Sequence, residues 1–340
     1  MCDTVNIETK ILELLSRNPE GIPQSNLAKA LGISKAYISI ILRELEKQSL
    51  IYRVRIGNTY IVKPVIPKHC LGYNKELKVF RIGIVWSSEY LFLGYFAKNL
   101  REKEDIELKV HVYPSAVQAV LALIKGEVDA SLSPMVTQIY GYLLSRSFYI
   151  AGGGASGGGY IYEFPESKTD IIISSEISTM DLCRYLALKQ KYIGDVSTRY
   201  FSSAQEATLL ARKRLARYAV VWHPLNTEME LIGGRKMFGC LDLEEMKYCC
   251  TFAISRSLSY EVIETMSKIY RESIEMFKRD RERYVEWYST VVGIDTALLK
   301  KAVNEYVYEP QLDSKYFVKI VDILGFEIPH KIQLYRAIHL

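Results

Sequence analysis

The chain lacks long apolar runs and an apolar leader. None of the hydrophobic runs in its 340 residues approaches the roughly 18 residues that a membrane-spanning helix needs. Its start, Met1-Cys2-Asp3-Thr4, is polar and contains no core of a secretion signal. These absences predict a cytoplasmic protein that makes no membrane contact.

Cysteine and histidine patterns that mark metal sites are also missing. The five histidines have no HExxH spacing, and the cysteines have no CxxC spacing. The cysteines are too sparse for a disulfide scaffold, so we expect reduced thiols, no metal site and no cofactor. The six cysteines are Cys2, Cys70, Cys183, Cys240, Cys249 and Cys250.

A glycine-rich segment from Gly152 to Gly157 satisfies the pattern GxGxxG without its context. Tyr160-Ile161-Tyr162 and Pro165 follow where a dinucleotide site needs a helix, which excludes that site. We expect a flexible or closely packed connection near a hinge, with a backbone amide cradle for an anion as the alternative.

Three helices are predicted in the first 48 residues. Apolar residues recur at helical spacing from Ile7 to Leu15, and a short second helix capped by Ser25 ends at Gly32, where a tight turn needs positive φ. Ser34 can cap a third helix. Its predicted buried face is Ile38, Ile41, Leu42 and Leu45.

A β-hairpin follows, since apolar and polar residues alternate on both sides of Gly57-Asn58. Two helices around a glycine turn and then a hairpin are typical of a winged helix-turn-helix. Residues 1–64 resemble the winged helix-turn-helix domains of bacterial and archaeal regulators. The segment "LAKALGISKAYISIILRELEKQSLI" matches the family's second helix, turn, third helix and strand in that order. The resemblance implies binding to double-stranded DNA.

The third helix and the hairpin are more basic than the rest of the chain, which fits a phosphate footprint. The third helix is expected to reach base edges or nearby phosphates, and the hairpin to touch the backbone or minor groove. The alternative is a winged helix that serves only for protein interaction or dimerisation. The candidate DNA-binding residues are Ser34, Lys35, Tyr37, Ser39, Arg43, Arg53, Arg55 and Asn58.

Residues 65–78 read as a linker, because Pro64, Pro67 and Gly72 punctuate them. Beyond it, short strands and helices alternate, which predicts an α/β domain with a largely parallel sheet. Val79–Trp86 is the first expected strand. Ser87-Ser88-Glu89 should start the helix that follows, through Leu100.

Three phrases carry a second resemblance: "RIGIVWSSEYLFLGYFAKNL", "ELKVHVYPSAVQAVLALIKGEVDASLSPMVTQI" and "FYIAGGGASGGGYIY". They look like the opening of type II periplasmic binding proteins of the branch that binds sulfonates, nitrate or thiamine pyrimidine precursors. The likeness covers residues 79–325 and implies two lobes, the second of them at about 163–248. A tail at 326–340 would follow the whole domain.

A ligand of such a fold would sit beyond the carboxyl ends of the strands, between the lobes. Helix N-termini there favour anionic or polar groups. Serines that cap helices have that structural role as the alternative to ligand contact. The candidate ligand-binding residues are Trp86, Ser87, Ser88, Glu89, Ser115, Ser133, Ser174, Ser175, Ser178, Thr179, Trp222 and His223.

Together the two resemblances predict a homodimeric, ligand-responsive transcription regulator, and not an enzyme. Its effector would be polar, anionic or similar to a thiamine pyrimidine. One alternative is a thiamine- or menaquinone-pathway enzyme on the same fold, for which Glu89, His223 and Cys250 are the available groups. Another is a ligand-binding protein that never touches DNA. Cys249 and Cys250 are faintly similar to a cysteine cluster of thiamine pyrimidine synthases, but that cluster has more cysteines, so buried structural thiols are expected.

Overall fold

The computed structural model divides the chain into two compact units, Met1–Glu76 and Leu77–Leu340. The structure describes residues 7–16, 18, 21–48, 50–56, 59–64, 77–243, 246, 248–325, 334 and 336–338. Asn58, Cys2 and Cys70 therefore lie outside the described residues.

The first unit is a winged helix, as predicted. A three-stranded antiparallel sheet of order β1-β3-β2 packs with three helices around Leu27, Ile38, Leu42 and Val62, all fully buried. Its elements are α1 (Ile7–Ser16), β1 (Ile22–Pro23), α2 (Gln24–Ala30), α3 (Lys35–Lys47), β2 (Ile51–Ile56) and β3 (Thr59–Pro64).

The starts of α2 and α3 can be compared with the predicted helix caps. The prediction that Ser25 caps α2 is wrong: the helix begins at Gln24, directly after Pro23, whose ring holds φ at −56°. The prediction for Ser34 is confirmed, since its Oγ accepts the Tyr37 N–H at 3.1 Å. Gly32 has φ +65°, the left-handed conformation expected of the turn between α2 and α3.

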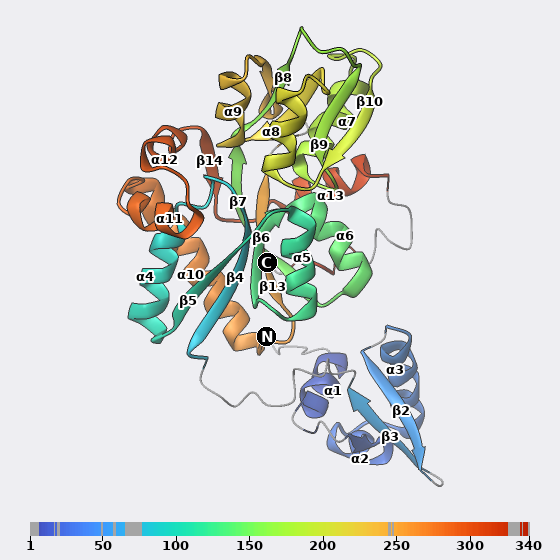
Figure 1. Cartoon of the computed structure of the whole chain (residues 1–340). Helices are drawn as coiled ribbons and strands as arrows, with labels where there is room; N and C mark the ends of the chain where they lie inside the picture. Colours follow the sequence, from blue (N-terminus) through green and yellow to red (C-terminus); the bar gives the residue numbers. More distant parts are fainter. Residues whose placement is uncertain are drawn as a thin grey trace. The chain divides into compact units, whose positions relative to one another are not determined.

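The second unit contains two sheets, and the larger one belongs to the first lobe. This six-stranded sheet has the order β14-β7-β13-β6-β4-β5 (Figure 1). Its strands are β4 (Val79–Val85), β5 (Glu107–Tyr113), β6 (Ala130–Pro134), β7 (Phe148–Gly157), β13 (Cys250–Ser255) and β14 (Tyr306–Glu309).

This sheet is mixed, so the prediction of a largely parallel sheet is wrong. β4 runs parallel to β5 and β6, but β13 is antiparallel to both β6 and β7. The reason is topological: the chain returns from the second lobe in the opposite direction and inserts β13 between β6 and β7.

Helices cover both faces of the six-stranded sheet (Figure 1). α4 (Leu93–Glu104) and α10 (Tyr260–Arg279) lie on one side, and α5 (Ala116–Lys125) and α6 (Met135–Ser145) lie on the other. The core contains an aromatic stack, in which Phe252 of β13 lies 4.3 Å from the ring of Tyr270 on α10. Such offset ring pairs add to the free energy gained by burial.

The helix predicted to start at Ser87 begins only at Leu93. Residues 86–92 form bends and turns whose backbone groups bond to distant partners. Tyr288 Oη donates to Ser87 O at 2.6 Å, and Tyr308 Oη donates to Glu89 O at 3.0 Å. Tertiary hydrogen bonds therefore satisfy this segment in place of a helical ladder.

The second lobe holds a five-stranded sheet of order β10-β9-β11-β8-β12. It begins at Gly159, slightly before the predicted boundary at residue 163. Its elements are β8 (Gly159–Glu163), β9 (Ile171–Ser175), α7 (Thr179–Lys189), β10 (Ser197–Phe201), α8 (Ala204–Arg212), β11 (Tyr218–Trp222), α9 (Leu225–Leu231) and β12 (Arg235–Gly239).

A disulfide joins Cys183 on α7 to Cys240, which starts a short 3-10 helix after β12. The expectation of reduced thiols is therefore wrong for this pair. The two cysteines are 57 residues apart in sequence, and folding brings their Cα atoms to 5.6 Å, which is a normal disulfide separation. Sequence spacing could not reveal that approach.

The glycine-rich segment is part of β7, so it is not a flexible connection. A Cβ on Gly153 or Gly154 would collide with Glu309 O or Cys250 O, which confirms close packing. The Gly153 amide donates to Pro310 O at 3.1 Å and is not open to an anion.

The remaining helices, α11 (Val285–Val292), α12 (Thr296–Ala302) and α13 (Ser314–Ile323), complete the second unit. In the predicted tail, Leu334 and Ala337 are buried, and Ile150 N donates to Ala337 O at 2.7 Å. These tail residues therefore pack on β7. Among the described residues, no helix has the length and apolar character needed to cross a membrane.

Candidate DNA interface and ligand pocket

α3 and its N-cap present several predicted DNA-binding residues to solvent. Lys35, Tyr37 and Arg43 are exposed, Ser39 is half-buried, and Ser34 is exposed as the N-cap. Ile38 and Leu42 point inward, so the predicted inside and outside of α3 agree with the structure. An exposed helix start of this kind can enter a major groove.

Arg53 on the wing forms an ion pair within the domain. Its Nε and guanidinium nitrogen donate to Glu46 Oε2 at 3.1 and 2.6 Å, and its side chain is only 15% exposed. The hydrogen bonds from Arg53 hold the pKa of the Glu46 carboxyl below its usual value. Arg53 thus ties β2 to α3.

Arg55 is exposed on β2, two residues beyond Arg53. Tyr52 and Tyr60 on the wing are also exposed, at 46% and 44%. Sequence reasoning did not select these tyrosines, although their position in the hairpin was visible.

In the second unit a pocket of about 460 Å³, open solvent included, lies between the two lobes. β4, β6, β9, β10 and β11 all direct their carboxyl ends toward it, as predicted for the ligand site. From the first lobe it is lined by Val85, Ser87, Glu89, Tyr90, Pro114, Ser115, Ala116, Pro134, Cys249 and Cys250. From the second lobe it is lined by Ser175, Ser178, Thr179, Met180, Phe201, Ser202 and Trp222.

Two helices begin at the pocket wall. Ser115 caps α5 and accepts from Gln118 N at 3.3 Å, and Ser178 caps α7 and accepts from Asp181 N at 3.2 Å. The first turn of each helix has N–H groups without helical partners and carries a partial positive charge. The two helix starts therefore favour an anionic or strongly polar ligand group.

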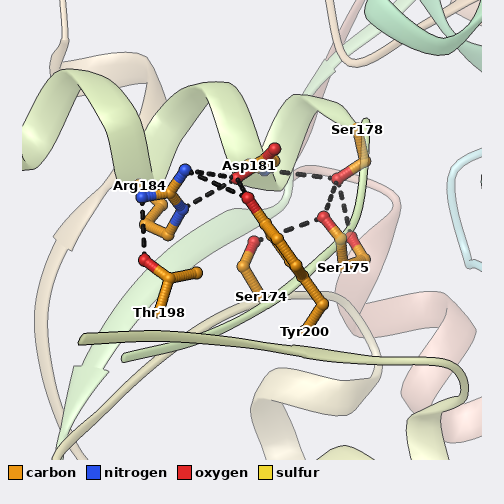
Figure 2. A network of polar contacts seen from close by, with 7 residues as sticks. All are labelled: Ser174, Ser175, Ser178, Asp181, Arg184, Thr198 and Tyr200. Atoms are coloured by element: carbon orange, nitrogen blue, oxygen red, sulfur yellow. Dashed lines mark hydrogen bonds and ion pairs between the residues drawn. The ribbon is translucent and has the colours of Figure 1, made fainter. Parts of the chain in front are cut away.

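A network of hydrogen bonds holds the serines that lie just before α7 (Figure 2). Ser175 Oγ and Ser178 Oγ are 2.7 Å apart. Behind them, Asp181 accepts from Arg184 Nε at 2.7 Å, and Arg184 also donates to Thr198 Oγ1 at 3.0 Å. Arg184 is thus held by hydrogen bonds within this network. None of the described lining residues is a lysine, arginine or histidine.

An aromatic wall borders the pocket in the second lobe. The rings of Phe201 and Trp222 are stacked, with centroids 6.1 Å apart and planes 30° apart. Trp222 was predicted to contact a ligand, whereas Phe201 was missed, because it ends a strand, β10, that the sequence pattern did not reveal. A flat ligand group could pack against this wall.

The pocket floor holds acidic and thiol groups. Glu89 is 1% exposed, its Oε1 has no hydrogen-bond partner, and burial raises the pKa of its carboxyl to about 7. Tyr90 Oη donates to Cys250 Sγ at 3.0 Å, and the Sγ atoms of Cys249 and Cys250 are 3.8 Å apart. Cys249 and Cys250 are buried, as predicted, but their meeting with Glu89 was not foreseen.

Five predicted ligand residues do not line the pocket: Trp86, Ser88, Ser133, Ser174 and His223. Trp86 Nε1 donates to Val292 O at 3.0 Å, and Ser133 Oγ accepts from Gln138 Nε2 at 3.1 Å. Ser174 alternates away from Ser175 on β9 and is buried. Strand ends were located correctly, but the direction of each side chain was not.

Ser88 and His223 join the lobes at a point outside the pocket. Ser88 Oγ lies 2.6 Å from His223 Nδ1 and 3.1 Å from Tyr306 Oη. Burial lowers the pKa of His223, against the opposing influence of Glu305 and Glu230, so the neutral imidazole is favoured. His223 therefore supports the arrangement of the lobes and does not face a ligand.

Comparison with known proteins supports the fold described for each of the two units. Residues 7–58 match the sequence model of the MarR family, so the N-terminal unit is a MarR-type winged helix domain. No protein of curated function matches the chain.

Solved structures of several binding proteins share the fold of the second unit. One, from Staphylococcus aureus and solved with zinc bound, has a TM-score of 0.64 at 17% identity, covering 76% of this chain and 98% of its own. The alkanesulfonate-binding protein SsuA from Xanthomonas axonopodis pv. citri, bound to MOPS, has a TM-score of 0.64 at 14% identity, covering 78% and 99%. The periplasmic nitrate-binding protein NrtA from Synechocystis has a TM-score of 0.58 at 9% identity, covering 77% and 85%. The second unit therefore has the type II periplasmic-binding-protein-like fold.

Proposed function

We propose that this protein is a cytoplasmic, ligand-responsive transcription regulator that binds double-stranded DNA as a homodimer. The pairing of a MarR-type winged helix with a two-lobed pocket carries the proposal. The exposed cations Lys35 and Arg43 on α3 suit DNA, and the pocket suits a small molecule.

The effector is a small molecule with an anionic or strongly polar end. That end would lie at the starts of α5 and α7, near Ser115 and Ser178. A flat or apolar part would rest against Phe201 and Trp222. The binding of MOPS by the SsuA relative and of nitrate by the NrtA relative supports an anionic group.

Control of DNA binding requires that the effector prefer one arrangement of the lobes. A ligand with equal affinity for two conformations shifts nothing, whatever its affinity. Closure of the pocket around the ligand would supply the preference, because Ser115 and Ser178 come from different lobes and one ligand can contact both. A homodimer would then present two α3 helices to half-sites of a palindrome.

Native mass spectrometry of the purified full chain, followed by genomic DNA selection with and without the recovered ligand, tests this proposal. We expect a co-purifying small molecule and enriched DNA fragments whose affinity changes with ligand. Enrichment of no fragment would refute DNA binding, and an affinity that ignores the ligand would refute effector control.

An enzyme on the same fold is the second candidate, favoured by Glu89. A buried carboxyl with a pKa near 7 in a pocket is suited to general acid-base chemistry. His223, the other predicted acid-base group, lies outside the pocket. Turnover of the recovered ligand by wild type, abolished in Glu89→Gln, would support the enzyme, whereas recovery of unchanged ligand would support the regulator.

A further inference from the structure

Three groups that can bind a metal ion meet in the pocket floor. Glu89 follows β4, and Cys249 and Cys250 lie where the chain re-enters the first-lobe sheet at β13. One carboxylate oxygen and both sulfurs lie within 4.8 Å of one another. The linear sequence gives no metal spacing, because Glu89 is far from the cysteines along the chain.

The separation of the sulfurs suits a tetrahedral ion. Two thiolates about 2.3 Å from a tetrahedral Zn²⁺ are about 3.8 Å apart. Cys250 Sγ donates to Cys249 Sγ across 3.8 Å, the same separation. The pair is therefore spaced for chelation before a metal arrives.

The floor gathers three side chains that can bind a cation in their ionised forms. Glu89 and both cysteines are buried, and no described lining residue supplies a positive charge. A divalent ion would permit the thiols and the carboxyl to ionise together, releasing their protons to solvent.

The surroundings of the cluster resemble a supporting shell. Tyr90 Oη donates to Cys250 Sγ at 3.0 Å, which treats that sulfur as an acceptor. Thr179 Oγ1 donates to Cys249 O at 2.7 Å. Glu89 Oε1, buried and without a partner, is available to a ligand. Hydrogen bonds of this kind orient metal ligands and tune their affinity.

We propose that Glu89, Cys249 and Cys250 bind a thiophilic divalent ion of the Zn²⁺ type. Three protein ligands leave the fourth tetrahedral position open to the pocket, where water or the anionic group of an effector completes the coordination. The site deepens the proposed function, on whose pocket it rests, by adding a cation where the helix starts already favour an anion.

The test uses the full chain carrying Cys2→Ser and Cys70→Ser, purified without metal and kept anaerobic, in the absence of DNA. Co²⁺ serves as the optical probe and Zn²⁺ as its competitor. We expect one Co²⁺ per chain, a thiolate-to-cobalt absorption band, and displacement of that band by one equivalent of Zn²⁺. Native mass spectrometry should give the same stoichiometry.

Variants locate the site. Cys249→Ala and Cys250→Ala should each weaken Zn²⁺ binding more than about 100-fold, and Tyr90→Phe about 10-fold or more. Glu89→Gln should weaken binding while the cobalt band keeps its thiolate character. Arg101→Ala, which changes an exposed residue of α4 outside the pocket, should bind Zn²⁺ as the parent does. Circular dichroism melts identify any variant that fails to fold.

The absence of a cobalt band in the folded parent would overturn the proposal. Unchanged Zn²⁺ affinity in Cys249→Ala/Cys250→Ala would overturn it as well. Neither result would bear on DNA selection or on recovery of an organic ligand, so failure of the metal site is distinguishable from failure of the regulator.

Discussion

Trp222 Nε1 donates a hydrogen bond to the carbonyl oxygen of Trp86 at 2.8 Å. Trp222 ends β11 in the second lobe, and Trp86 follows β4 in the first, so this bond joins the lobes beside the pocket. Both residues were predicted to stack on a ligand. The structure instead places Trp86 outside the pocket and gives Trp222 two roles, one in the wall and one in the bond between lobes.

Replacement of Trp222 by phenylalanine should remove that bond and keep most of the ring. We expect the free energy of unfolding to fall by about 1 kcal/mol, the usual net contribution of one hydrogen bond. Urea titration measures it, with Trp287→Phe, which keeps the bond, as the control. The prediction also includes weaker retention of the co-purifying ligand, and equal retention by both variants would contradict a wall role for Trp222.

The two wing arginines should have separable effects. Arg53→Ala should lower the stability of the winged helix by about 1 kcal/mol, because it leaves the half-buried Glu46 carboxylate without its partner. Arg55→Ala should reduce the slope of log K against log salt by about 0.9, as expected for one lost phosphate contact.

Anisotropy titration of selected DNA at several salt concentrations measures that slope. Arg101→Ala changes an exposed cation on α4 and should have no effect on the slope. If Arg53→Ala reduced the slope while stability stayed constant, Arg53 would be a DNA contact and its pairing with Glu46 incidental.

Stability should depend on His223 at mildly acidic pH. Burial lowers the pKa of His223 from 6.5, so the folded state binds this proton less readily than the unfolded state. The contribution is complete above pH 6.5 and is lost as pH falls through 6.5 toward the lower folded pKa. Urea titrations across this range should show the loss in wild type and its absence in His223→Asn; identical pH profiles would exclude His223 as the source.

The bond between Cys183 and Cys240 should stabilise the second lobe. Closing a loop of 57 residues restricts the unfolded chain by about 4 kcal/mol in the chain-entropy description. Peptide mapping without reductant should recover the linked peptides. Cys183→Ser/Cys240→Ser should unfold at lower denaturant concentration than Cys249→Ser, which removes a thiol but no bond. Recovery of both as free thiols from the folded chain would refute the pairing.

Sequence reasoning was most successful where the determinants are local. The inward face of α3 follows from the spacing of Ile38, Ile41, Leu42 and Leu45, and its cap Ser34 was predicted. Helical periodicity and capping depend on residues within a few positions of one another. Local patterns therefore predicted the helices of the winged helix, and the two resemblances predicted both folds.

Pairings across long stretches of chain could not be predicted. Glu46 and Arg53 lie seven residues apart in different elements, and only folding shows that they pair. Spacing likewise gives no sign that Cys183 meets Cys240, or that Glu89 meets Cys250. Such contacts depend on how strands are ordered, and the insertion of β13 as an antiparallel strand was not apparent from the apolar pattern.

The whole second lobe is inserted between β7 and β13, two strands that are hydrogen-bonded neighbours in the first-lobe sheet. Both covalent connections between the lobes thus leave from one narrow line, where Cys250 is paired with Ala155. A rotation of the second lobe about that line would carry Phe201 and Ser202 through a wide arc and displace Cys250 very little. A group bound at Cys250 would therefore stay near the rotation axis while the pocket wall formed by Phe201 and Ser202 moves relative to it.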